Sequence, residues 1–431
     1  MLTITVFLLL VLAGSGLFVA AVLGLLGFSL ATFFSPFPVI RGLGEIAWTS
    51  SADFILVAVP MFILMGELLL RSGVTDAMYE ALDRWVGHIP GGLMHTNIAA
   101  SAVFAATSGS SIATAATIGT VSIPNMDRFG YDPKVFLGSI AAGGTLGILI
   151  PPSINLVLYG AMSDTAVGDL YLAGLIPGVV LACLFSLYIY LRCKLNPALA
   201  PSGNVTSWSR RLRGLVHLVP PLLLFFLVVG SIYAGFATAT EASALGVMGS
   251  LLLVILRGRL AVPMLLRAFE GTVRTTAMVM AIVIAAYFLN FVLSTLGLTD
   301  ATVKWVGQLG WSPTGVLFAI VALYIVLGCF VESLTLMIAT TPIVVPIIKQ
   351  LGFSPVWFGV VFVILIETAL ITPPIGMNLF VVQSVRKGGP LRDVILGSLP
   401  YVVLMFLLIL ALIAFPDLAL WLPSAFAASR G

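Results

Sequence analysis

The chain has 431 residues, of which 60% are hydrophobic and only 9% are charged, and its mean hydropathy is +1.16. A soluble domain carries roughly 25% charged residues, so this composition excludes a soluble globular protein and predicts an all-α, polytopic protein in a lipid bilayer. The net charge of +3 says little by itself, and we expect no nucleic-acid partner.

The first apolar run, Leu2 to Phe34, has no basic segment before it and no obvious cleavage site. We therefore expect a retained transmembrane helix and not a signal peptide, so that residues 1–52 form this helix and an external loop. Residues 53–193 follow as the first of two repeats. Within them we expect a re-entrant helical hairpin at about 94–123 and a broken transmembrane helix at about 136–160.

The most basic stretch of the chain, Arg192 to Arg213, contains no acid and is rich in Pro, Ser and Gly. It is therefore a loop, and its charge places it in the cytoplasm. Residues 194–273 comprise this loop, a connecting helical hairpin (Leu215 to Tyr233 and Ala242 to Leu256) and an amphipathic segment, Val262 to Glu270.

A second amphipathic segment is Thr75 to Val86, in which charged residues interleave with Met, Leu and Trp. We expect both amphipathic segments to lie along the membrane surface, where they brace a fixed scaffold. The second repeat follows at 274–416, with a hairpin at about 316–347 and a broken helix at about 356–386. Residues 417–431 are a C-terminal tail.

The two repeats share proline and glycine landmarks at a constant shift of 222 positions, since 346 − 124 and 373 − 151 give the same number. The matching pairs are Pro124 and Pro346, Gly130 and Gly352, Pro133 and Pro355, and Pro151 and Pro373. Paired hydrophobic halves that are interrupted by Gly and Pro at matching places indicate a secondary transporter.

The basic residues also predict opposite orientations for the two repeats. Arg84 and Arg128 flank the first hairpin and both favour the cytoplasm, so this hairpin must return to the side it came from. With this topology sixteen Lys and Arg are cytoplasmic, and four are external: Arg41, Lys304, Lys349 and Arg430. The N-terminus is then cytoplasmic, the C-terminus is periplasmic, and the repeats are inverted.

Four segments must leave helical geometry inside the bilayer: the two hairpin tips and the two helix breaks. Such backbone has to be buried in protein or line a cavity. The segments are Thr107 to Ser111, Val331 to Thr335, Gly143 to Ser153, and Glu367 to Pro374. Exposed carbonyls and hydroxyls suit a hard cation such as sodium, and helix N-termini suit a carboxylate. The repeat therefore predicts two cation sites of similar build.

Two acids, Glu332 and Glu367, lie deep in apolar stretches of the second repeat. An ionisable group there is functional by default, although a carboxyl that caps a broken helix or is protonated is the plainer alternative. Under the shift of 222 their counterparts are Ser110 and Thr145, so the two halves differ in charge. For the small residues of the tips and breaks, such as Ser and Gly, close helix packing is an alternative role.

At Ala106 to Ser111, Ile150 to Ser153 and Ile371 to Gly376 the chain resembles a known family. It is similar to the large membrane subunit of the tripartite ATP-independent periplasmic (TRAP) transporters, over roughly residues 5 to 420. The resemblance implies a sodium-driven importer of an organic acid, often a C4-dicarboxylate or sialic acid, in the bacterial inner membrane. It also implies an elevator mechanism, in which a core of hairpins and broken helices slides against a scaffold.

The resemblance further implies two partners, a small four-helix membrane subunit and a periplasmic substrate-binding protein. It also implies positions for two sodium ions, carried over by position in this sequence. The first site would use Ser108, Gly109, Ser110, Ser111, Gly143, Gly147, Ile150 and Pro151. The second would use Glu332, Ser333, Thr335, Thr368, Thr372 and Pro373. For the substrate we expect Ser153, Asn155, Glu332 and Asn378.

Other functions remain open from the residues alone. A stand-alone sodium–dicarboxylate symporter or a cation antiporter of the same superfamily would share these features. A membrane enzyme is disfavoured because no nucleophile–base–acid set or metal-ligand cluster is visible in the sequence, and we expect no catalytic residue. A passive channel is disfavoured because the hairpins do not obviously meet to form a pore.

Overall fold

A computed structural model of the chain describes residues 2–201, 207–329 and 331–428, and within these ranges every regular element is a helix. Five of the described helices are long and apolar enough to cross a membrane, and up to eight spans result if each bent helix pair counts as one. The expectation of an all-helical, multi-span membrane protein with broken helices is confirmed.

The N-terminal region holds more helix than the sequence suggested. The run that we expected as one helix is two, because Gly16 adopts a left-handed conformation (φ 74°) that ends the first helix and starts a turn. The expected external loop also contains short helices. The elements are α1 (Leu2–Gly14), α2 (Val19–Phe34), the 3₁₀ helix η1 (Val39–Gly42) and α3 (Leu43–Ser51).

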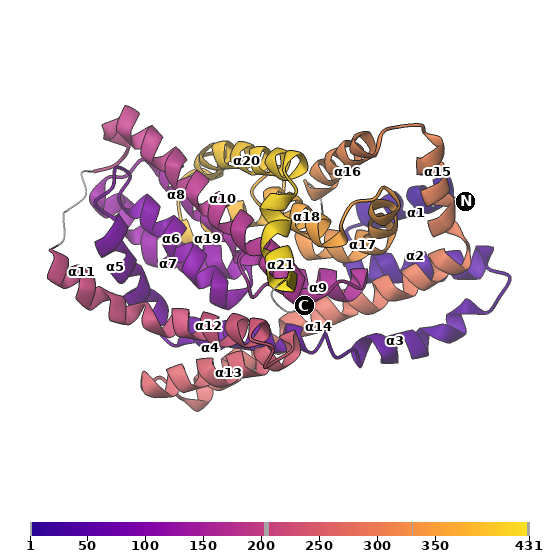
Figure 1. Ribbon diagram of the computed structural model, residues 1–431, viewed down its shortest axis with the longest axis horizontal. Helices are drawn as coiled ribbons and strands as arrows, with labels where there is room; N and C mark the ends of the chain where they lie inside the picture. Colours follow the sequence, from indigo (N-terminus) through magenta and orange to yellow (C-terminus); the bar gives the residue numbers. More distant parts are fainter. Residues whose placement is uncertain (1, 202–206, 330, 429–431) are drawn as a thin grey trace.

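The first repeat is a succession of three helix pairs and one long helix (Figure 1). Its elements are α4 (Ala58–Arg71), α5 (Val74–Val86), α6 (Leu93–Ser108), α7 (Ser111–Phe129), α8 (Pro133–Leu149), α9 (Ile154–Ser163) and α10 (Val167–Leu195). The α4–α5 pair is bent by 72° and the α8–α9 pair by 41°. The sharp bend before α5 suits a surface helix, and its position at the membrane surface stays a prediction.

The second repeat follows the same order after a connecting region. That region comprises η2 (Pro197–Leu199), α11 (Trp208–Gly214), η3 (Leu215–His217), α12 (Val219–Tyr233) and α13 (Ala239–Leu256). The second repeat comprises α14 (Val262–Thr295), α15 (Leu298–Gln308), α16 (Pro313–Gly328), α17 (Ser333–Gln350), α18 (Pro355–Leu370), α19 (Met377–Arg386) and α20 (Leu391–Ala414). The expected tail forms α21 (Asp417–Ala428), which packs against α10, while Arg430 lies outside the described residues.

Matching residues begin matching elements in the two repeats. Gly73 before α5 and Gly297 before α15 both adopt positive φ. α8 and α18 both begin with proline at their first position, behind a side-chain cap from Asp132 and Ser354 respectively. Proline at the first helical position is favourable because its missing N–H would be unpaired there anyway. The same local rules therefore build each half.

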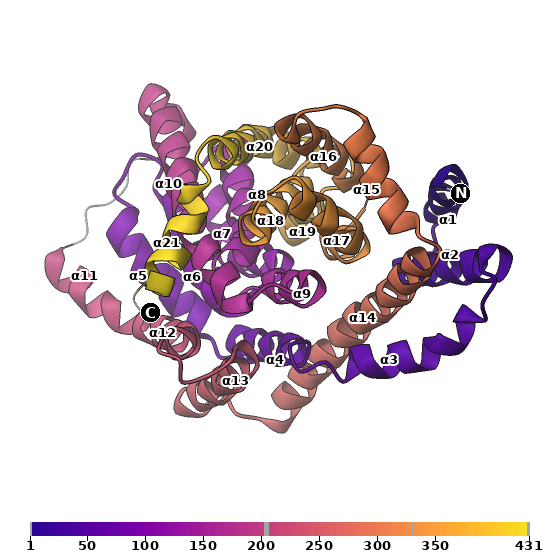
Figure 2. The ribbon, with the colours of Figure 1, turned by 45° about the vertical axis from the view of Figure 1, so that its right-hand side comes forward.

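One amphipathic segment differs from the prediction. Val262 to Glu270 is no separate surface helix but the first part of α14, a continuous helix of 34 residues. Apart from Pro263 in the first turn, no proline interrupts it, and Gly271 is tolerated because it faces Glu67 of α4, whose carboxyl carbon would lie 2.9 Å from a Cβ there. Figure 2 shows α14 as a long diagonal beside α2, α3 and α4.

Two helices lie at the centre of the bundle and are enclosed on all sides. α8 is buried from Val135 to Leu149, and α18 is buried from Trp357 to Leu370. α8 approaches α20 closely because both carry glycine at the crossing: a Cβ at Gly138 would overlap the Gly397 carbonyl oxygen. Small residues allow such close approach in membrane proteins, and this contact joins the first repeat to the second.

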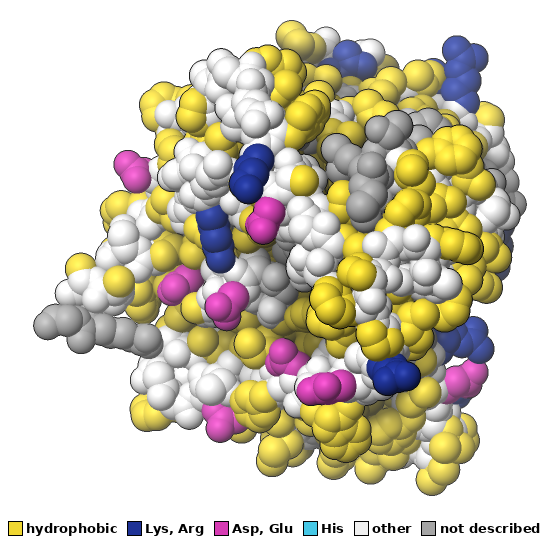
Figure 3. Space-filling model, turned by 90° about the vertical axis from the view of Figure 1, so that its right-hand side faces the viewer, with side chains coloured by type: hydrophobic (Ala, Val, Ile, Leu, Met, Phe, Trp, Pro, Cys, Tyr) yellow, Lys and Arg dark blue, Asp and Glu magenta, His cyan; other side chains and the backbone are white. Residues whose placement is uncertain are grey.

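The outer surface is largely apolar. Figure 3 shows hydrophobic side chains over much of one face, with a few charged side chains scattered among them. Large exposed side chains include Phe18, Phe33, Trp311 and Phe318. An apolar exterior over a core that holds buried polar groups is the arrangement expected in a bilayer.

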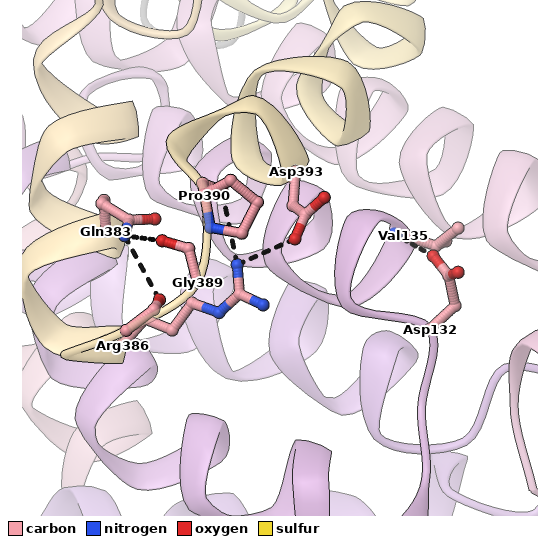
Figure 4. A network of polar contacts seen from close by, with 8 residues as sticks. Asp132, Val135, Gln383, Arg386, Gly389, Pro390 and Asp393 are labelled. Carbon is pink, nitrogen blue, oxygen red and sulfur yellow. Dashed lines mark hydrogen bonds and ion pairs between the residues drawn. The ribbon is translucent and has the colours of Figure 1, made fainter.

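Residues that the sequence places on one side of the membrane lie together. Lys349, predicted to be external, donates a hydrogen bond from Nζ to the carbonyl oxygen of Ser163 at 3.2 Å, and the segment Ser163 to Asp169 is external under the same predicted topology. On the predicted cytoplasmic side, Arg386 at the end of α19 pairs at 3.0 Å with Asp393 in the first turn of α20, near Asp132 at the start of α8 (Figure 4). The orientation itself stays a prediction.

Candidate functional site

The first hairpin turns within two residues. α6 ends at Ser108 because Gly109 adopts a left-handed conformation (φ 60°), which glycine reaches without steric cost. α7 begins at Ser111, and the Ser110 hydroxyl caps it by accepting a hydrogen bond from the Ala113 N–H at 3.3 Å. The tip therefore joins the carbonyl end of one helix to the amide end of the next.

The tip packs directly on the broken helix and on α4. A Cβ at Gly147 would lie 2.8 Å from the Ser110 carbonyl oxygen, and a Cβ at Gly109 would lie 2.9 Å from the Pro152 carbonyl oxygen. A Cβ at Gly66 of α4 would lie 3.2 Å from the Ser108 carbonyl oxygen. Glycine is thus required for the tip to reach its place, and the place is rich in uncharged oxygens.

The first break spans residues 150–153, fewer than the Gly143 to Ser153 segment that we expected. Gly143 and Gly147 lie inside α8, because glycine in a membrane helix can serve close packing without unwinding it. Ser153 caps α9 by accepting from the Leu156 N–H at 3.3 Å. The peptide bond between Pro151 and Pro152 is cis, as is the one between Pro373 and Pro374.

Asn155 lies at the start of α9 and lines a cavity between the two hairpin tips. The residue is 1% exposed, and its amide nitrogen Nδ2 has no hydrogen-bond partner among the described residues. A buried donor without a partner is costly, and a ligand that accepts a hydrogen bond would remove this cost. Asn155 is therefore a candidate to meet a carboxylate.

The second hairpin tip carries a charge where the first has none. Glu332 caps α17, and its carboxylate accepts from the Leu334 N–H at 3.1 Å, the Thr335 N–H at 3.0 Å and the Ser333 hydroxyl at 3.2 Å. The capping alternative left open for Glu332 is thus observed. The same side chain also lines the cavity, so it can meet a ligand as well.

The second break separates Leu370 at the end of α18 from Met377 at the start of α19. The hydroxyls of Thr368 and Thr372 both donate to carbonyl oxygens four residues earlier, each at 2.7 Å. Since each hydroxyl has only one proton, these side chains can only accept from, or coordinate, anything else. This property suits a cation and does not suit a carboxylate.

Both tips open on a single cavity. The volume of this cavity is about 130 Å³. One water needs about 10–15 Å³, so a small organic acid fits. Its lining includes Ser110, Ser111, Asn155, Glu332 and Ser333 from the two repeats, and Glu67 of α4. Glu67 is paired with Arg71 at 2.7 Å.

A hydrogen bond crosses between the repeats behind this cavity. The Ser111 hydroxyl at the first tip donates to Glu367 Oε2 of α18 at 2.5 Å. Glu367 is 1% exposed, and its other oxygen, Oε1, has no hydrogen-bond partner among the described residues. The first tip is therefore tied to the broken helix of the second repeat.

Comparison with known proteins decides the family. Residues 4–418 match the family described as "Tripartite ATP-independent periplasmic transporter, DctM component". The chain belongs to the DctM family. This DctM-family permease is a multi-pass protein of the bacterial inner membrane, and its family is one of transporters and not of enzymes. The resemblance in the sequence is confirmed.

Similar relatives span nearly the same length. The permease is 34% identical to the C4-dicarboxylate TRAP transporter large permease protein DctM of Pseudomonas aeruginosa, over 93% of each chain. It is 33% identical to the sialic acid large permease protein SiaM of Vibrio cholerae, over 87% of each chain. It is 32% identical to the ectoine/5-hydroxyectoine large permease protein UehC of Ruegeria pomeroyi, over 85% of each chain.

Two solved structures share the fold at low sequence identity. The Alcanivorax borkumensis YdaH transporter, described as having an unusual topology, matches with a TM-score of 0.64 at 17% identity over 98% of each chain. The Neisseria gonorrhoeae MtrF protein, from a class of antimetabolite efflux pumps, matches with a TM-score of 0.61 at 14% identity, over 97% of this chain and 94% of MtrF. At these identities the likeness concerns the fold of the DctM-family permease alone.

The structure gathers part of the predicted site at the cavity. The predicted residues that line it are Ser108, Gly109, Ser110, Ser111, Asn155, Glu332 and Ser333. The others are not among the residues that line it: Gly143, Gly147, Ile150, Pro151, Ser153, Thr335, Thr368, Thr372, Pro373 and Asn378. Gly143 faces Ser101 of α6, and Asn378 donates to the Ala141 carbonyl oxygen at 3.3 Å, so these two contact α6 and α8 and do not line the cavity.

Three features of the site were not predicted. The wall that α4 contributes, with Gly66 and Glu67, was not predicted, although an acid in an apolar helix is a usable signal. Thr275 of α14 also lines the cavity, and nothing in its sequence context marks it. The contact of Glu367 with Ser111 joins residues 256 apart, and the sequence flagged both residues but not their pairing.

Proposed function

We propose that the chain is the membrane-spanning permease of a sodium-driven importer for a small organic carboxylate. The observation that carries this proposal is the cavity between the two tips, which places Asn155 Nδ2, an amide donor without a partner among the described residues, near a set of uncharged oxygens. A donor suits the carboxylate, and carbonyl and hydroxyl oxygens suit a hard cation. One cavity can thus hold both.

The substrate class follows from the relatives and the site together. The similar permeases are named for C4-dicarboxylates, sialic acid and ectoine, which all carry a carboxylate. The N-terminus of α7 opens on the cavity, and the partial positive charge of a helix N-terminus attracts anions. A carboxylate held between this helix end and Asn155 would leave the rest of the solute free to vary.

Sodium would bind beside each tip. At the first site the oxygens of Ser108, Ser110 and Ser111 meet the α8–α9 break, and at the second the tip at Glu332 and Ser333 faces the break after Thr368. A cation at either place would hold a tip against its break. Binding of sodium would therefore prepare the cavity for the acid, which is the coupling that a symporter needs.

Movement of the core would carry the cavity across the membrane. The helices enclosed at the centre, α8 and α18, would slide as a body with both tips, while α4, α12, α13 and α14 would form the fixed scaffold. The pairing of α12 with α13 and of α4 with both α13 and α14 supports a scaffold of this composition. A small four-helix subunit would enlarge the scaffold, and a periplasmic binding protein would deliver the acid.

Reconstitution tests the proposal. Proteoliposomes that contain this chain with a small TRAP membrane subunit should take up a carboxylate from its loaded periplasmic binding protein when a sodium gradient is imposed. Replacement of external sodium by choline should abolish uptake. Undiminished uptake in choline would overturn sodium coupling, and robust uptake of free acid by this chain alone would favour a stand-alone symporter.

A further inference from the structure

Ser111 lines the cavity and is the one described residue that donates a hydrogen bond to the Glu367 carboxyl. Its hydroxyl donates to Glu367 Oε2 at 2.5 Å, whereas Glu367 itself does not line the cavity. The two residues belong to different repeats, Ser111 to the first turn of α7 and Glu367 to the last turns of α18. Glu367, which is outside the cavity lining, therefore acts on Ser111, which is part of it, through this hydrogen bond.

The control acts on the direction in which the hydroxyl points. A serine hydroxyl has one proton and two lone pairs. Because Glu367 takes the proton, the Ser111 oxygen can present only lone pairs to anything on its other side. A cation attracts lone pairs, whereas a carboxylate needs the proton. Ser111 is thereby fixed as a ligand for a cation and is withdrawn from binding the organic acid.

Among the described residues, Ser111 alone donates a hydrogen bond to the Glu367 carboxyl. Its side chain is 1% exposed, none of the ion pairs among the described residues includes it, and Oε1 accepts no hydrogen bond from the described residues. A buried polar group is retained at a cost, and the one contact that offsets this cost is the hydrogen bond from Ser111. Acceptance of that proton needs an oxygen and does not need a charge.

We propose that Glu367 is a positioning residue of the first cation site, which turns the Ser111 hydroxyl so that its lone pairs face the cation. The proposal rests on the sodium coupling proposed above. Since Glu367 belongs to the broken helix of the second repeat, the first cation site is complete only when the two repeats are docked against each other at this point. Sodium binding at one tip then depends on the position of the opposite half.

Two substitutions of Glu367 separate the effect of its hydrogen-bond acceptor from the effect of its charge. Glu367→Gln keeps an oxygen that can accept from Ser111, whereas Glu367→Leu removes it at similar volume. Binding is measured without transport, as the rise in melting temperature of the purified complex with the small subunit when sodium replaces choline. Glu367→Gln should keep the sodium concentration for half of this rise within about twofold, and Glu367→Leu should raise it by about tenfold, the upper range for one hydrogen bond.

Uptake assays give a second readout. At saturating sodium the KM for the acid should stay within about twofold in Glu367→Leu, while half-saturation by sodium shifts by about tenfold, because the residue acts on the cation alone. Ser111→Ala should shift sodium to the same extent, and the double variant should be no weaker than Ser111→Ala, since the two residues make one interaction. Ser250→Ala, whose hydroxyl donates to the Val247 carbonyl oxygen within α13, is the matched control.

Each outcome decides between the two proposals. If the unaltered complex shows no sodium-dependent rise in melting temperature and no sodium-dependent uptake, the proposed function fails. If it shows both, but Glu367→Leu leaves half-saturation by sodium unchanged, or Glu367→Gln is as weak as Glu367→Leu, the positioning role is overturned. Glu367→Met, which keeps the length of the side chain, carries the same test if Glu367→Leu does not fold.

Discussion

The two hairpin tips share a backbone plan and differ in chemistry. The first tip is capped by the hydroxyl of Ser110, and the second is capped by the carboxylate of Glu332 at the matching position. At the first contact with the broken helix, the small residue is Gly147 of α8, whereas at the second, Ala369 of α18 meets Gly328 of the hairpin. The glycine belongs to the broken helix at the first contact and to the hairpin at the second, and both contacts are close.

This comparison separates what the repeat must keep from what it can vary. The caps and the glycine contacts set where each tip stands, and both halves satisfy them with different residues. The charge at the tip is not needed for the backbone, since Ser110 caps as Glu332 does. The difference therefore belongs to the ligands, and it predicts that the two cation sites are not equivalent.

The strongest test of the comparison is sidedness, because an inverted repeat gives an all-or-none result. In a chain whose own Cys183, Cys193 and Cys329 are replaced by serine, a cysteine at exposed Arg128 should react only with reagents on the cytoplasmic side. A cysteine at exposed Lys349 should react only from outside. Reaction of both from the same side would remove the inverted repeat.

The second prediction addresses the close approach at the first tip. Gly147→Ala should push the tip off α8, because the new Cβ would lie 2.8 Å from the Ser110 carbonyl oxygen. Overpacking of this kind costs about 1–3 kcal/mol, so half-saturation by sodium should rise about tenfold or more in uptake assays. Gly230→Ala in α12, where nothing lies within 4 Å, should leave it unchanged, and an equal effect at both positions would contradict the reason given.

The third prediction gives the second tip the cap of the first. Glu332→Ser keeps a side-chain acceptor for the start of α17, so the melting temperature should change by less than about 4 °C. Uptake driven by sodium should fall about tenfold, because a charge-assisted contact to the cation is lost. Glu332→Ala should lose both the uptake and the stability of the cap. Full uptake with Glu332→Ser would show that the charge has no role.

The smallest effect is expected far from the tips, at the ion pair of Arg386 and Asp393, whose side chains are 13% and 17% exposed. Asp393→Asn should destabilise the protein by about 1–3 kcal/mol, the range for a hydrogen bond to a charged group, seen as a lower melting temperature. Half-saturation by sodium should not move. The exposed pair of Glu270 and Arg274 provides the control, since Glu270→Gln should be silent.

Much of the fold was predictable because its signals are local. The Pro-Pro pairs marked both breaks, and the segment Thr107 to Ser111 contained the first tip, which turns at Gly109 and Ser110, since proline and glycine act on the backbone at their own positions. A different signal, amphipathicity, misjudged Val262 to Glu270: charged residues among apolar ones were interpreted as a surface helix, although the segment is the start of the continuous helix α14. Amphipathicity describes a face of a helix and not its end.

The site was predictable to a smaller degree because it is made by distant contacts. The tips could be named, but which glycine faces a tip and which faces a neighbouring helix depends on the rotation of α8. Gly147 meets Ser110, whereas Gly143, one turn away, meets Ser101. The bond between Ser111 and Glu367 joins two repeats, and no spacing within a single sequence encodes it.

The crossing of Gly138 and Gly397 has a consequence for how the protein is made. α8 is synthesised long before α20, yet a Cβ at Gly138 of α8 would overlap the backbone of α20 at Gly397. Part of the surface that finally encloses α8, contributed by α18, α19 and α20, therefore does not exist when α8 leaves the ribosome. Thr145 of α8, whose hydroxyl finally lies 4.0 Å from Met405 Sδ of α20, spends that interval beside lipid or an insertion factor, and the first half of the permease can complete its packing only after most of the second has been translated.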